Sequence, residues 1–565
     1  MLLGHFIENA ALREPHLPAL RFEDTVLDYG TLADRVTRIA NALRSLAPPE
    51  SRIAFLSGNR AEIVELQTAV PMAGMGCVFV NHRLTPPEIA FILQNSGAHA
   101  IAVSDEYRPV VESIRAQLPH LRTLILLDEP ADSSAPATGG AAAGSNTTTA
   151  EAPLSTQPGG ASADGDLSDL QTVPFSQLTA HPDDAPSWAD LSEHTLAWLV
   201  YTSGTTGRPK GAMISHRNLV SAIANSLAGV DAPKGGRYLN PFPLCHIAAY
   251  GSHTRFADRG EIVLQRKFEP ELYMRTIAEL GISSSSIAPA MLGLILARPE
   301  LLDTDTSSLR SMAYGASSIS PDLLRKSMDL FPNARFTQGF GMTELAGNVV
   351  WMDHDMHLAG LEPGSTLLSA AGKVAPFAAV RVVDPMGEPV PNGKVGEIEV
   401  RADQVMLGYW QNPEATAEVM HDGWYATGDI GRFTDEGVLY IVDRKKDMIV
   451  TGGLNVYSRE VEDVIADHPD VVDVAVIGVP EDIWGESVCA VIVRREGSDL
   501  DFDGVVAHVK TRLASFKKPK YVEFRDELPR NPTGKVLKRD LRESVAVGQG
   551  AESPGAVAPG AGVPE

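Results

Sequence analysis

The segment Tyr201–Gly211, with the sequence YTSGTTGRPKG, groups hydroxyls, glycines and a lysine in one short stretch. It follows the apolar run Leu196–Val200, which predicts a buried strand, so the polar groups lie just past a strand end. The glycines let backbone N–H groups turn toward a ligand, the hydroxyls add donors, and Lys210 adds a mobile positive charge. The pattern is typical of phosphate binding, with a solvated loop as the alternative. The Walker A pattern is absent, so a P-loop NTPase is not indicated.

Two further segments carry carboxylates in settings suited to a nucleotide. In the first, Phe340 offers a flat apolar face to a purine, and Thr343 and Glu344 add a hydroxyl and a carboxylate suited to phosphates and Mg²⁺. A capping or solvated glutamate is the alternative for Glu344. The second, DGWYATGD at 422–429, ends in Asp429, whose carboxylate can accept both hydroxyls of a ribose. An exposed turn aspartate is the alternative there.

Five motifs follow one another along the chain: YTSGTTGRPKG at 201–211, QGFGMTE at 338–344, YATGD at 425–429, DRKKDMIVTGGLNV at 443–456 and PRNPTGK at 529–535. In residue types and in order, the sequence resembles the ANL superfamily of adenylate-forming enzymes, and within it the acyl-CoA synthetases. The resemblance spans nearly the whole chain apart from one insert and the tail. It implies an ATP-dependent acid–thiol ligase that converts a carboxylic acid, through an acyl-adenylate, to its CoA thioester with release of AMP and pyrophosphate.

The same resemblance implies roles for individual residues. Catalysis of adenylation falls to Lys210, Thr343, Glu344 and Lys535, with Glu344 also holding Mg²⁺. Nucleotide binding falls to Thr202, Ser203, Gly204, Thr205, Thr206, Gly207, Lys210, Gly315, Ala316, Gln338, Gly339, Phe340, Gly341, Thr343, Asp429, Arg444 and Lys535. Phe340 stands where the family more often has tyrosine, so stacking is kept and a hydroxyl contact is lost. Ala316 stands where a glycine is common, which leaves the shape of the neighbouring pocket open.

The acyl pocket is expected around the segment LNPFPLCHIAAY, where His246 lies among apolar residues. A lone histidine in such a setting is more often a core residue, but a similar string lines the acyl pocket of the family. We therefore assign His246 to the pocket wall and not to proton transfer. The resemblance adds Tyr250, Gly251, Tyr314 and Gly315 to the same wall. The apolar wall favours a medium- or long-chain fatty acid, with aromatic and steroid side-chain acids left open.

The charged segment Asp443–Asp447 would by itself predict a solvated turn. The resemblance makes it a domain boundary with Lys446 as the pivot of a mobile lid, since a hinge needs few residues. Lys535 would enter the active site for adenylation. Rotation would then withdraw it and bring in the CoA channel residues Gly452, Gly453 and Leu454, where missing side chains leave room for the pantetheine arm.

The apolar periodicity predicts an α/β fold with parallel strand pairing in the N-terminal part. The elements expected there include helices at 30–46 and at 61–70, which Pro71 ends, and strands at 52–56, 77–80, 98–103, 282–287 and 311–314. Turn signals between Gly372 and Val400 predict a small antiparallel barrel or sheet. The C-terminal part predicts a compact α+β unit with helices at 460–465 and 505–513 and strands at 471–479 and 488–493.

These patterns, together with the resemblance, divide the chain into an N-terminal adenylation domain at 1–445, a small mobile lid domain at 446–547 and a disordered tail at 548–565. Residues from about 128 to 169 are mostly Ala, Gly, Ser, Thr and Pro, with almost nothing to bury. They predict a disordered low-complexity insert within the first domain. A partner-binding role for the insert is the alternative to a tolerated surface loop.

Length and composition bound the class of protein. A chain of 565 residues is too long for one core, and its 44% apolar and 21% charged content is ordinary for a globular protein. A net charge of −24 argues against a nucleic-acid partner. Three scattered cysteines favour a reducing cytoplasm over a disulfide framework or a zinc site. The first residues do not resemble a signal peptide, and no apolar run is long enough to cross a bilayer, which leaves peripheral membrane contact open.

The expected partners are therefore a small-molecule carboxylic acid, ATP and CoA, with a homodimer left open. Within the superfamily, the acceptor could be the phosphopantetheine of a carrier protein, or the adenylate could be oxidised as in luciferases. A catalytically silent nucleotide-binding scaffold is the alternative from another class. The presence of Lys535, Glu344 and the whole phosphate-binding segment favours an enzyme.

Overall fold

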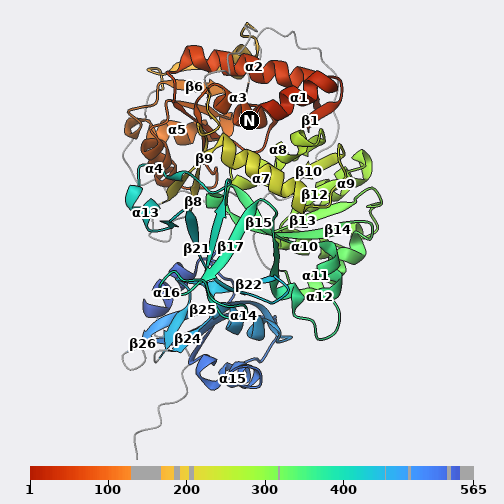
Figure 1. The fold of residues 1–565 in the computed structure, drawn as a ribbon, viewed down its shortest axis with the longest axis vertical. Coiled ribbons are helices and arrows are strands. Elements are labelled where there is room, and N and C mark those ends of the chain that lie inside the picture. Colours follow the sequence, from red (N-terminus) through yellow and green to blue (C-terminus); the bar gives the residue numbers. More distant parts are fainter. Residues whose placement is uncertain are drawn as a thin grey trace, which may run out of the picture. The chain divides into compact units, whose positions relative to one another are not determined.

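The structure is a computed structural model, and it describes residues 1–128, 167–182, 191–202, 209–315, 319–451, 454–481, 485–530 and 536–547. The chain forms two compact units, Met1–His216 with Pro243–His246 and Arg217–Phe242 with Ile247–Glu565 (Figure 1). Both units combine helices with sheets, so the predicted α/β class is confirmed. The predicted domain boundary at residue 445 stays a prediction.

The first unit is built on a mostly parallel sheet with the strand order β9-β8-β4-β3-β5-β6-β7. The strands of the first unit are β1 (Pro18–Phe22), β2 (Thr25–Asp28), β3 (Arg52–Leu56), β4 (Gly76–Phe79), β5 (Ala100–Val103), β6 (Thr123–Leu126), β7 (Gln171–Pro174), β8 (Leu196–Thr202) and β9 (Lys210–Ser215). Of these, β1 and β2 lie outside the sheet just described. The helices of this unit are α1 (His5–Arg13), α2 (Tyr29–Leu46), α3 (Ala61–Met72), α4 (Pro86–Ser96), α5 (Arg108–Ile114) and α6 (Phe175–Thr179). Strands β3 to β8 pair in parallel along this order, which confirms the predicted parallel layer.

Helix α2 shows how the sequence pattern becomes structure. Asp28 caps the helix, because its carboxylate accepts a hydrogen bond from the backbone N–H of Thr31 at 2.8 Å. Leu32, Val36 and Ile39 recur at helical spacing and are buried. The predicted helix at 30–46 is therefore confirmed, with its start one residue earlier.

Helix α3 continues through Pro71 to Met72, so the prediction that Pro71 ends this helix is wrong. Proline lacks the N–H that would bind the carbonyl four residues earlier, which is that of Gln67. In the folded protein, the indole N–H of Trp198 in β8 donates to this carbonyl at 3.0 Å. The Gln67 carbonyl thus keeps a partner in the core, and the helix tolerates a proline near its C-terminal end.

The second unit contains a longer sheet with the strand order β17-β18-β21-β22-β16-β15-β14-β13-β12-β10-β11. Its strands are β10 (Arg237–Asn240), β11 (Glu261–Leu264), β12 (Ser284–Ile287), β13 (Ser311–Tyr314), β14 (Arg335–Met342), β15 (Gly347–Met352), β16 (Ala370–Val374), β17 (Ala378–Val383), β18 (Gly396–Ala402), β19 (Gly408–Tyr409), β20 (Met420–His421), β21 (Trp424–Phe433) and β22 (Leu439–Arg444). The accompanying helices are α7 (His216–Gly229), α8 (Tyr250–Ala257), α9 (Pro270–Leu280), α10 (Pro289–Leu296), α11 (Pro321–Leu330), α12 (His354–Gly360) and α13 (Pro413–Ala417).

Strand direction divides this sheet into two regions. Strands β10 to β14 pair in parallel, and β17, β18, β21 and β22 pair antiparallel. The antiparallel strands include the segment where turn signals between Gly372 and Val400 predicted such pairing. Buried side chains that include Tyr273, Met312 and Phe336 form the core of the parallel region.

The C-terminal residues form a third sheet, with β27 (Tyr521–Arg525) beside β26 (Gly485–Arg494) and the order β24-β23-β26-β25. The remaining strands are β23 (Ile449–Thr451), β24 (Leu454–Val456) and β25 (Val471–Glu481). The helices are α14 (Ser458–Ala466), α15 (Phe502–Lys510) and α16 (Lys538–Val547). Val461, Val476 and Ile492 belong to a buried core between this sheet and its helices, as the predicted compact α+β unit requires.

The predicted insert and tail lie largely outside the described residues, since 129–166 and 548–565 are not described. The approximate ends assigned to the insert belong to the fold. Asp128 accepts a hydrogen bond from Arg60 at 2.8 Å, and Asp169 pairs with Arg115. In the described parts of the chain, no helix has both the length and the apolar character needed to span a bilayer.

We expect Trp198→Phe to lower the free energy of unfolding by about 2 kcal/mol, because it removes the donor to the buried Gln67 carbonyl and part of a buried ring. Pro71→Ala supplies a helical N–H to the same carbonyl. Pro71→Ala should therefore change the free energy of unfolding more favourably in the Trp198→Phe protein than in the unsubstituted protein. Urea unfolding of the four proteins measures the coupling free energy. A coupling near zero would contradict the role given to the indole.

Candidate active site

Strands β13 and β14 bring residues from distant motifs into one register. The two strands are parallel, and Tyr314 lies opposite Gln338 as its cross-strand partner. Gly315 follows Tyr314, and a Cβ on Gly315 would lie 3.1 Å from the carbonyl oxygen of Gly339. The structure therefore brings together four predicted site residues, two from the expected acyl pocket and two from the expected nucleotide-binding segment.

Gly341 lies where β14 enters its hairpin with β15. The register of the two strands shifts between Phe340 and Gly341, and a Cβ on Gly341 would lie 2.0 Å from the carbonyl oxygen of Gly347. Any side chain at Gly341 would force the two backbones apart. This glycine thus has a packing reason in addition to its predicted role in nucleotide binding. Phe340 is half-buried beside it.

Glu344 is held in the short turn Thr343–Leu345 that follows β14. Its backbone carbonyl accepts the N–H of Met406 at 2.8 Å, and its carboxylate Oε1 accepts the hydroxyl of Tyr409 at 2.9 Å. Glu344 and Thr343 are both half-buried. The carboxylate is therefore fixed by a phenol, unlike a freely solvated glutamate.

Two tyrosines that the motif reasoning missed lie beside this carboxylate. Tyr425 donates its hydroxyl to the sulfur of Met342 at 3.5 Å, and Tyr409 binds Glu344. Burial first, and the charge of Glu344 second, raise the pKa of both phenols. Both phenols therefore stay protonated and act as donors. Tyr425 lay within a recognised motif without an assigned role, whereas no sequence signal marked Tyr409.

Asp429 lies in β21 and is buried, which excludes an exposed turn aspartate. Arg444 occupies the cross-strand position on β22, and its Nε lies 2.6 Å from Oδ1 of Asp429. The backbone N–H of Asp429 donates to the hydroxyl of Thr427 at 3.0 Å. Asp429, predicted to bind the ribose, and Arg444, predicted to contact the ribose or the phosphates, thus form an ion pair on neighbouring strands.

His246 belongs to the first unit. Its Nε2 lies 3.4 Å from the side-chain nitrogen of Asn81. Burial first, and the nearby His82 and Arg83 second, together lower the pKa of His246 to about 4. The imidazole is therefore neutral at pH 7. This favours the assignment of His246 to a pocket wall, which stays a prediction.

Tyr250 begins α8 in the second unit and is buried. Its hydroxyl accepts a hydrogen bond from the side-chain amide of Asn348 at 3.1 Å and lies 3.1 Å from the hydroxyl of Ser226. Its ring packs so closely on Gly347 that a Cβ there would lie 2.8 Å from Cζ. The phenol is thus locked by the structure. Gly251 follows Tyr250 in the chain. A Cβ placed on Gly251 would lie 3.4 Å from the hydroxyl oxygen of Tyr238.

The segment predicted to bind phosphate is described only at its ends, both in the first unit. Thr202 closes β8, Lys210 opens β9, and the two residues lie opposite each other in the antiparallel pair. The strand predicted at 196–200 is confirmed as part of β8. Ser203, Gly204, Thr205, Thr206 and Gly207 lie outside the described residues, as does Ala316.

The predicted pivot Lys446 is exposed in the turn between β22 and β23. Leu454 begins β24 with half of its surface exposed. Gly452, Gly453 and Lys535 lie outside the described residues, so their roles stay predictions.

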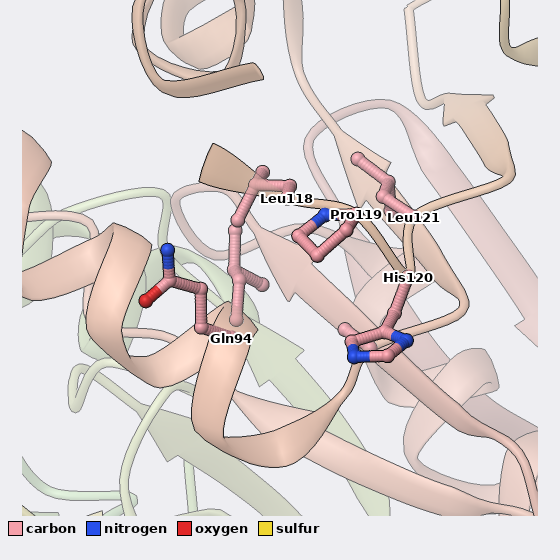
Figure 2. Close-up of a pocket in the computed structure, with 7 residues that line it drawn as sticks. Gln94, Leu118, Pro119, His120 and Leu121 are labelled. Carbon is pink, nitrogen blue, oxygen red and sulfur yellow. The ribbon is translucent and has the colours of Figure 1, made fainter. Parts of the chain in front are cut away.

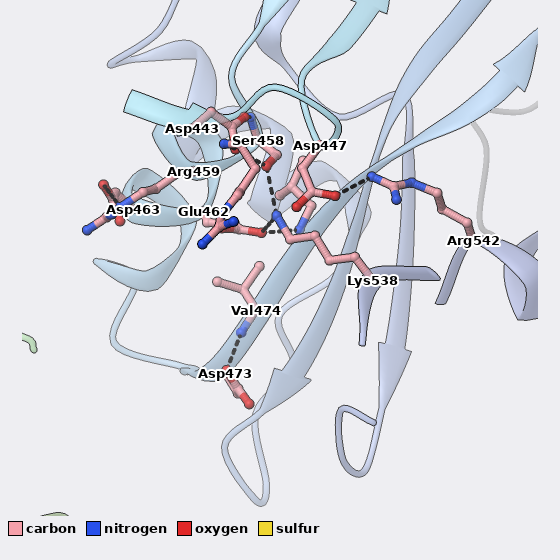
Figure 3. A network of polar contacts seen from close by, with 12 residues as sticks. Asp443, Asp447, Ser458, Arg459, Glu462, Asp463, Asp473, Val474, Lys538 and Arg542 are labelled. Carbon is pink, nitrogen blue, oxygen red and sulfur yellow. Dashed lines mark hydrogen bonds and ion pairs between the residues drawn. The ribbon is translucent and has the colours of Figure 1, made fainter. Parts of the chain in front are cut away.

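A network of polar contacts includes Asp443 and Asp447, which lie on either side of the predicted pivot in the chain (Figure 3). Asp443, near the end of β22, accepts hydrogen bonds from the backbone N–H and the hydroxyl of Ser458, the first residue of α14. Lys538 of α16 donates to the Ser458 hydroxyl at 2.7 Å and pairs with Glu462 at 2.6 Å. The network therefore joins elements that precede and follow Lys446 in the chain.

A second contact ties α16 to the same region. Arg542 pairs with Asp447 at 2.9 Å. Burial by itself would raise the pKa of Asp447, but Lys538 and Arg542 together hold it below its usual value. Because α16 begins three residues after Lys535, these contacts anchor the chain next to the predicted catalytic lysine.

Figure 2 shows a small hollow in the first unit, lined by Leu93, Gln94, Ala98 and residues 118–121. It leaves essentially no room for a water-sized molecule. None of its lining residues is a predicted site residue, and it has no charged side chain to orient a ligand.

Comparison with known proteins agrees with these features. The AMP-binding enzyme family matches residues 7–410, and the AMP-binding enzyme C-terminal domain matches residues 460–535. A feruloyl-CoA synthase from an Amycolatopsis species is 35% identical over 543 residues, which are 96% of this chain and 98% of the relative. The fatty acid–[acyl-carrier-protein] ligase ScoC of Streptomyces coeruleorubidus is 34% identical over 541 residues, 94% of each chain. The solved structure of amide bond synthetase McbA from Marinactinospora thermotolerans superposes with a TM-score of 0.78 at 26% identity, covering 96% of this chain and 99% of that one.

The chain therefore belongs to the AMP-binding enzyme family, within the ANL superfamily of adenylate-forming enzymes. Its fold has the large N-terminal and small C-terminal domains of the solved adenylate-forming structures. Acyl-CoA ligases are among its relatives, so the prediction of an AMP-forming acid–thiol ligase is confirmed.

We expect Tyr409→Phe to slow adenylate formation about tenfold, because Glu344 loses the donor that fixes its carboxylate. Pyrophosphate release measures this step. Tyr440→Phe is the matched control, since its hydroxyl contacts Thr366 at 3.4 Å and no predicted site residue. Equal rates in the unsubstituted protein and in Tyr409→Phe would contradict the role of Tyr409.

Proposed function

We propose that this protein is an AMP-forming acyl-CoA synthetase acting in two steps. In the first, a carboxylate oxygen of the substrate attacks the α-phosphorus of ATP, and the bond to pyrophosphate breaks. In the second, the CoA thiol attacks the acyl carbonyl, the C–S bond forms, AMP leaves, and the thiol proton passes to solvent. The observation that carries the proposal is the Glu344 carboxylate, fixed by Tyr409 directly after the glycine-rich end of β14.

The first step brings anions together and needs positive charge fixed where charge accumulates in the transition state. We assign this charge to Lys210 and Lys535, on the strength of their positions in the family motifs. Arg444 and Asp429 would hold the ribose side of the nucleotide. Their ion pair supports this, because the buried carboxylate of Asp429 and the partly exposed guanidinium of Arg444 are already oriented before a ligand binds.

Glu344 suits a Mg²⁺ ion that arrives with ATP. Such an ion is held by one or two protein carboxylates and otherwise by phosphate oxygens and water. One oxygen of Glu344 accepts from Tyr409, and among the described residues no hydrogen bond engages the other. The described residues also contain no cluster of three acidic, histidine or cysteine side chains, so a metal held by the protein alone is not supported. When bound, Mg²⁺ would neutralise charge on the phosphates.

We further propose a carboxylic acid with an apolar body as the substrate, and a medium- or long-chain fatty acid as the first choice. The neutral imidazole of His246 and its buried neighbours Leu244 and Cys245 support an apolar wall. An aromatic acid is the second candidate, because a feruloyl-CoA synthase is among the relatives. CoA is the proposed acceptor, with a carrier protein as the alternative raised by ScoC.

The lid would rotate about Lys446 between the two steps, exchanging Lys535 for the edge formed by Gly452, Gly453 and Leu454. The contacts of Asp443 with Ser458 link strand β22 to helix α14 across Lys446, so this rotation would have to break them.

A panel of carboxylic acids tests the substrate and the acceptor together. We expect AMP release with fatty acids of medium or long chain, and thioester formation with CoA as the only thiol. A preference for hydroxycinnamic acids would select the second candidate. AMP without thioester would exclude CoA as the acceptor, and no AMP with any acid would contradict the proposal.

We expect Lys535→Ala to slow adenylate formation by a factor of about 100 or more, because positive charge at the transferring phosphoryl group is lost. Thioester formation from a supplied acyl-adenylate should be largely spared. Lys510→Ala, at an exposed position on α15, is the control and should leave both half-reactions unchanged. Equal losses in both half-reactions would contradict the assignment.

A further inference from the structure

A chain of buried polar contacts runs behind β13 and β14. The hydroxyl of Tyr314 lies 2.8 Å from Nε2 of His357 in α12 and 3.0 Å from Oε1 of the Gln338 side chain. The other ring nitrogen of His357, Nδ1, lies 2.6 Å from the backbone carbonyl oxygen of Asp353. His357 is fully buried, and no sequence motif pointed to it.

The hydrogens in this chain can be assigned one by one. The Asp353 carbonyl can only accept, so Nδ1 of His357 must carry a hydrogen. Burial lowers the pKa of His357 to about 4, so the imidazole is neutral at pH 7 and has only this one N–H. Nε2 is therefore an acceptor, and Tyr314 must donate to it. The phenol has then used its only hydrogen.

The orientation of the Gln338 amide follows from this assignment. Because the Tyr314 oxygen can now only accept, the amide must turn its NH₂ group toward Tyr314. The oxygen and nitrogen of an amide are close to isosteric, so this exchange moves no heavy atom. The amide oxygen then faces away from Tyr314. Among the described residues, Gln338 makes no other side-chain hydrogen bond.

We propose that Tyr314 and His357 are positioning residues that present the Gln338 amide oxygen to the nucleobase, so that the site selects a purine with a 6-amino group over one with a 6-oxo group. An amino group donates to this oxygen, whereas an oxo group would place two acceptors against each other. The inference rests on the proposed function, in which Gln338 belongs to the nucleotide-binding segment. It adds the reason for base discrimination and the residues behind it.

The test compares ATP with ITP, which replaces the 6-amino group by an oxo group. In His357→Phe the phenol loses its acceptor, so Tyr314 donates to the Gln338 oxygen and the NH₂ group turns to the base. We expect the ATP-to-ITP ratio of kcat/KM for pyrophosphate release to fall about tenfold or more. In Tyr314→Phe the amide is free to take either orientation, so a smaller fall is expected. The ratio of dissociation constants for the two nucleotides, measured by calorimetry without acid, should follow the same order.

Tyr273→Phe is the matched control, because it removes a buried hydroxyl that donates to Ser285 at 2.8 Å in the core of the same unit. It should lower thermal stability without changing the ATP-to-ITP ratio. Tyr314→Phe keeps the buried ring, so it provides a folded variant even where His357→Phe does not fold. An unchanged ratio in Tyr314→Phe that still binds ATP would overturn this inference and leave the proposed function standing. A wild-type protein that binds neither nucleotide would overturn both.

Discussion

Parallel pairing of β13 with β14 is the constraint on which the candidate site of the second unit depends. The ladder sets Tyr314 opposite Gln338, and the chain beyond Gln338 must then pass through its glycines to Glu344. A slip of one residue would turn the Gln338 side chain to the other face of the sheet. One set of backbone hydrogen bonds thus positions an expected acyl-pocket residue, the expected nucleotide-binding segment and the carboxylate that follows it.

Local donors hold two of the predicted site carboxylates in a chain with a net charge of −24. Glu344 is held by the Tyr409 hydroxyl, and Asp429 by the Arg444 guanidinium. Each contact is at least half-buried, where water and salt screen it less than at the surface. The geometry of the site therefore depends on a few named partners and not on the overall charge of the protein.

The local structure could be predicted wherever it follows from short-range patterns. The strands expected at 52–56 and 311–314 match β3 and β13 residue by residue, because short apolar runs between turn signals leave few alternatives. Pro71 was misjudged because the indole of Trp198 replaces the missing helical hydrogen bond. Trp198 lies 131 residues away from Gln67 in the sequence, so no local pattern predicts this hydrogen bond.

The same contrast applies to the candidate site. Motif residues such as Glu344 and Asp429 could be named from the sequence, because chemistry demands those residue types in that order. The partners that orient them could not be named, since Tyr409 lies 65 residues from Glu344 and His357 lies 43 residues from Tyr314. A hydrogen bond depends on distance and angle, and sequence spacing beyond one element fixes neither.

The sequence by itself determined the family and the class of reaction and predicted the residues of the site, because these depend on residue types and on their order along the chain. Only the tertiary structure decided that Asp429 is buried against Arg444, that a phenol fixes Glu344, and that a neutral histidine stands behind Tyr314. The physical reason is that burial and hydrogen-bond geometry arise only when strands and helices from distant parts of the chain pack together.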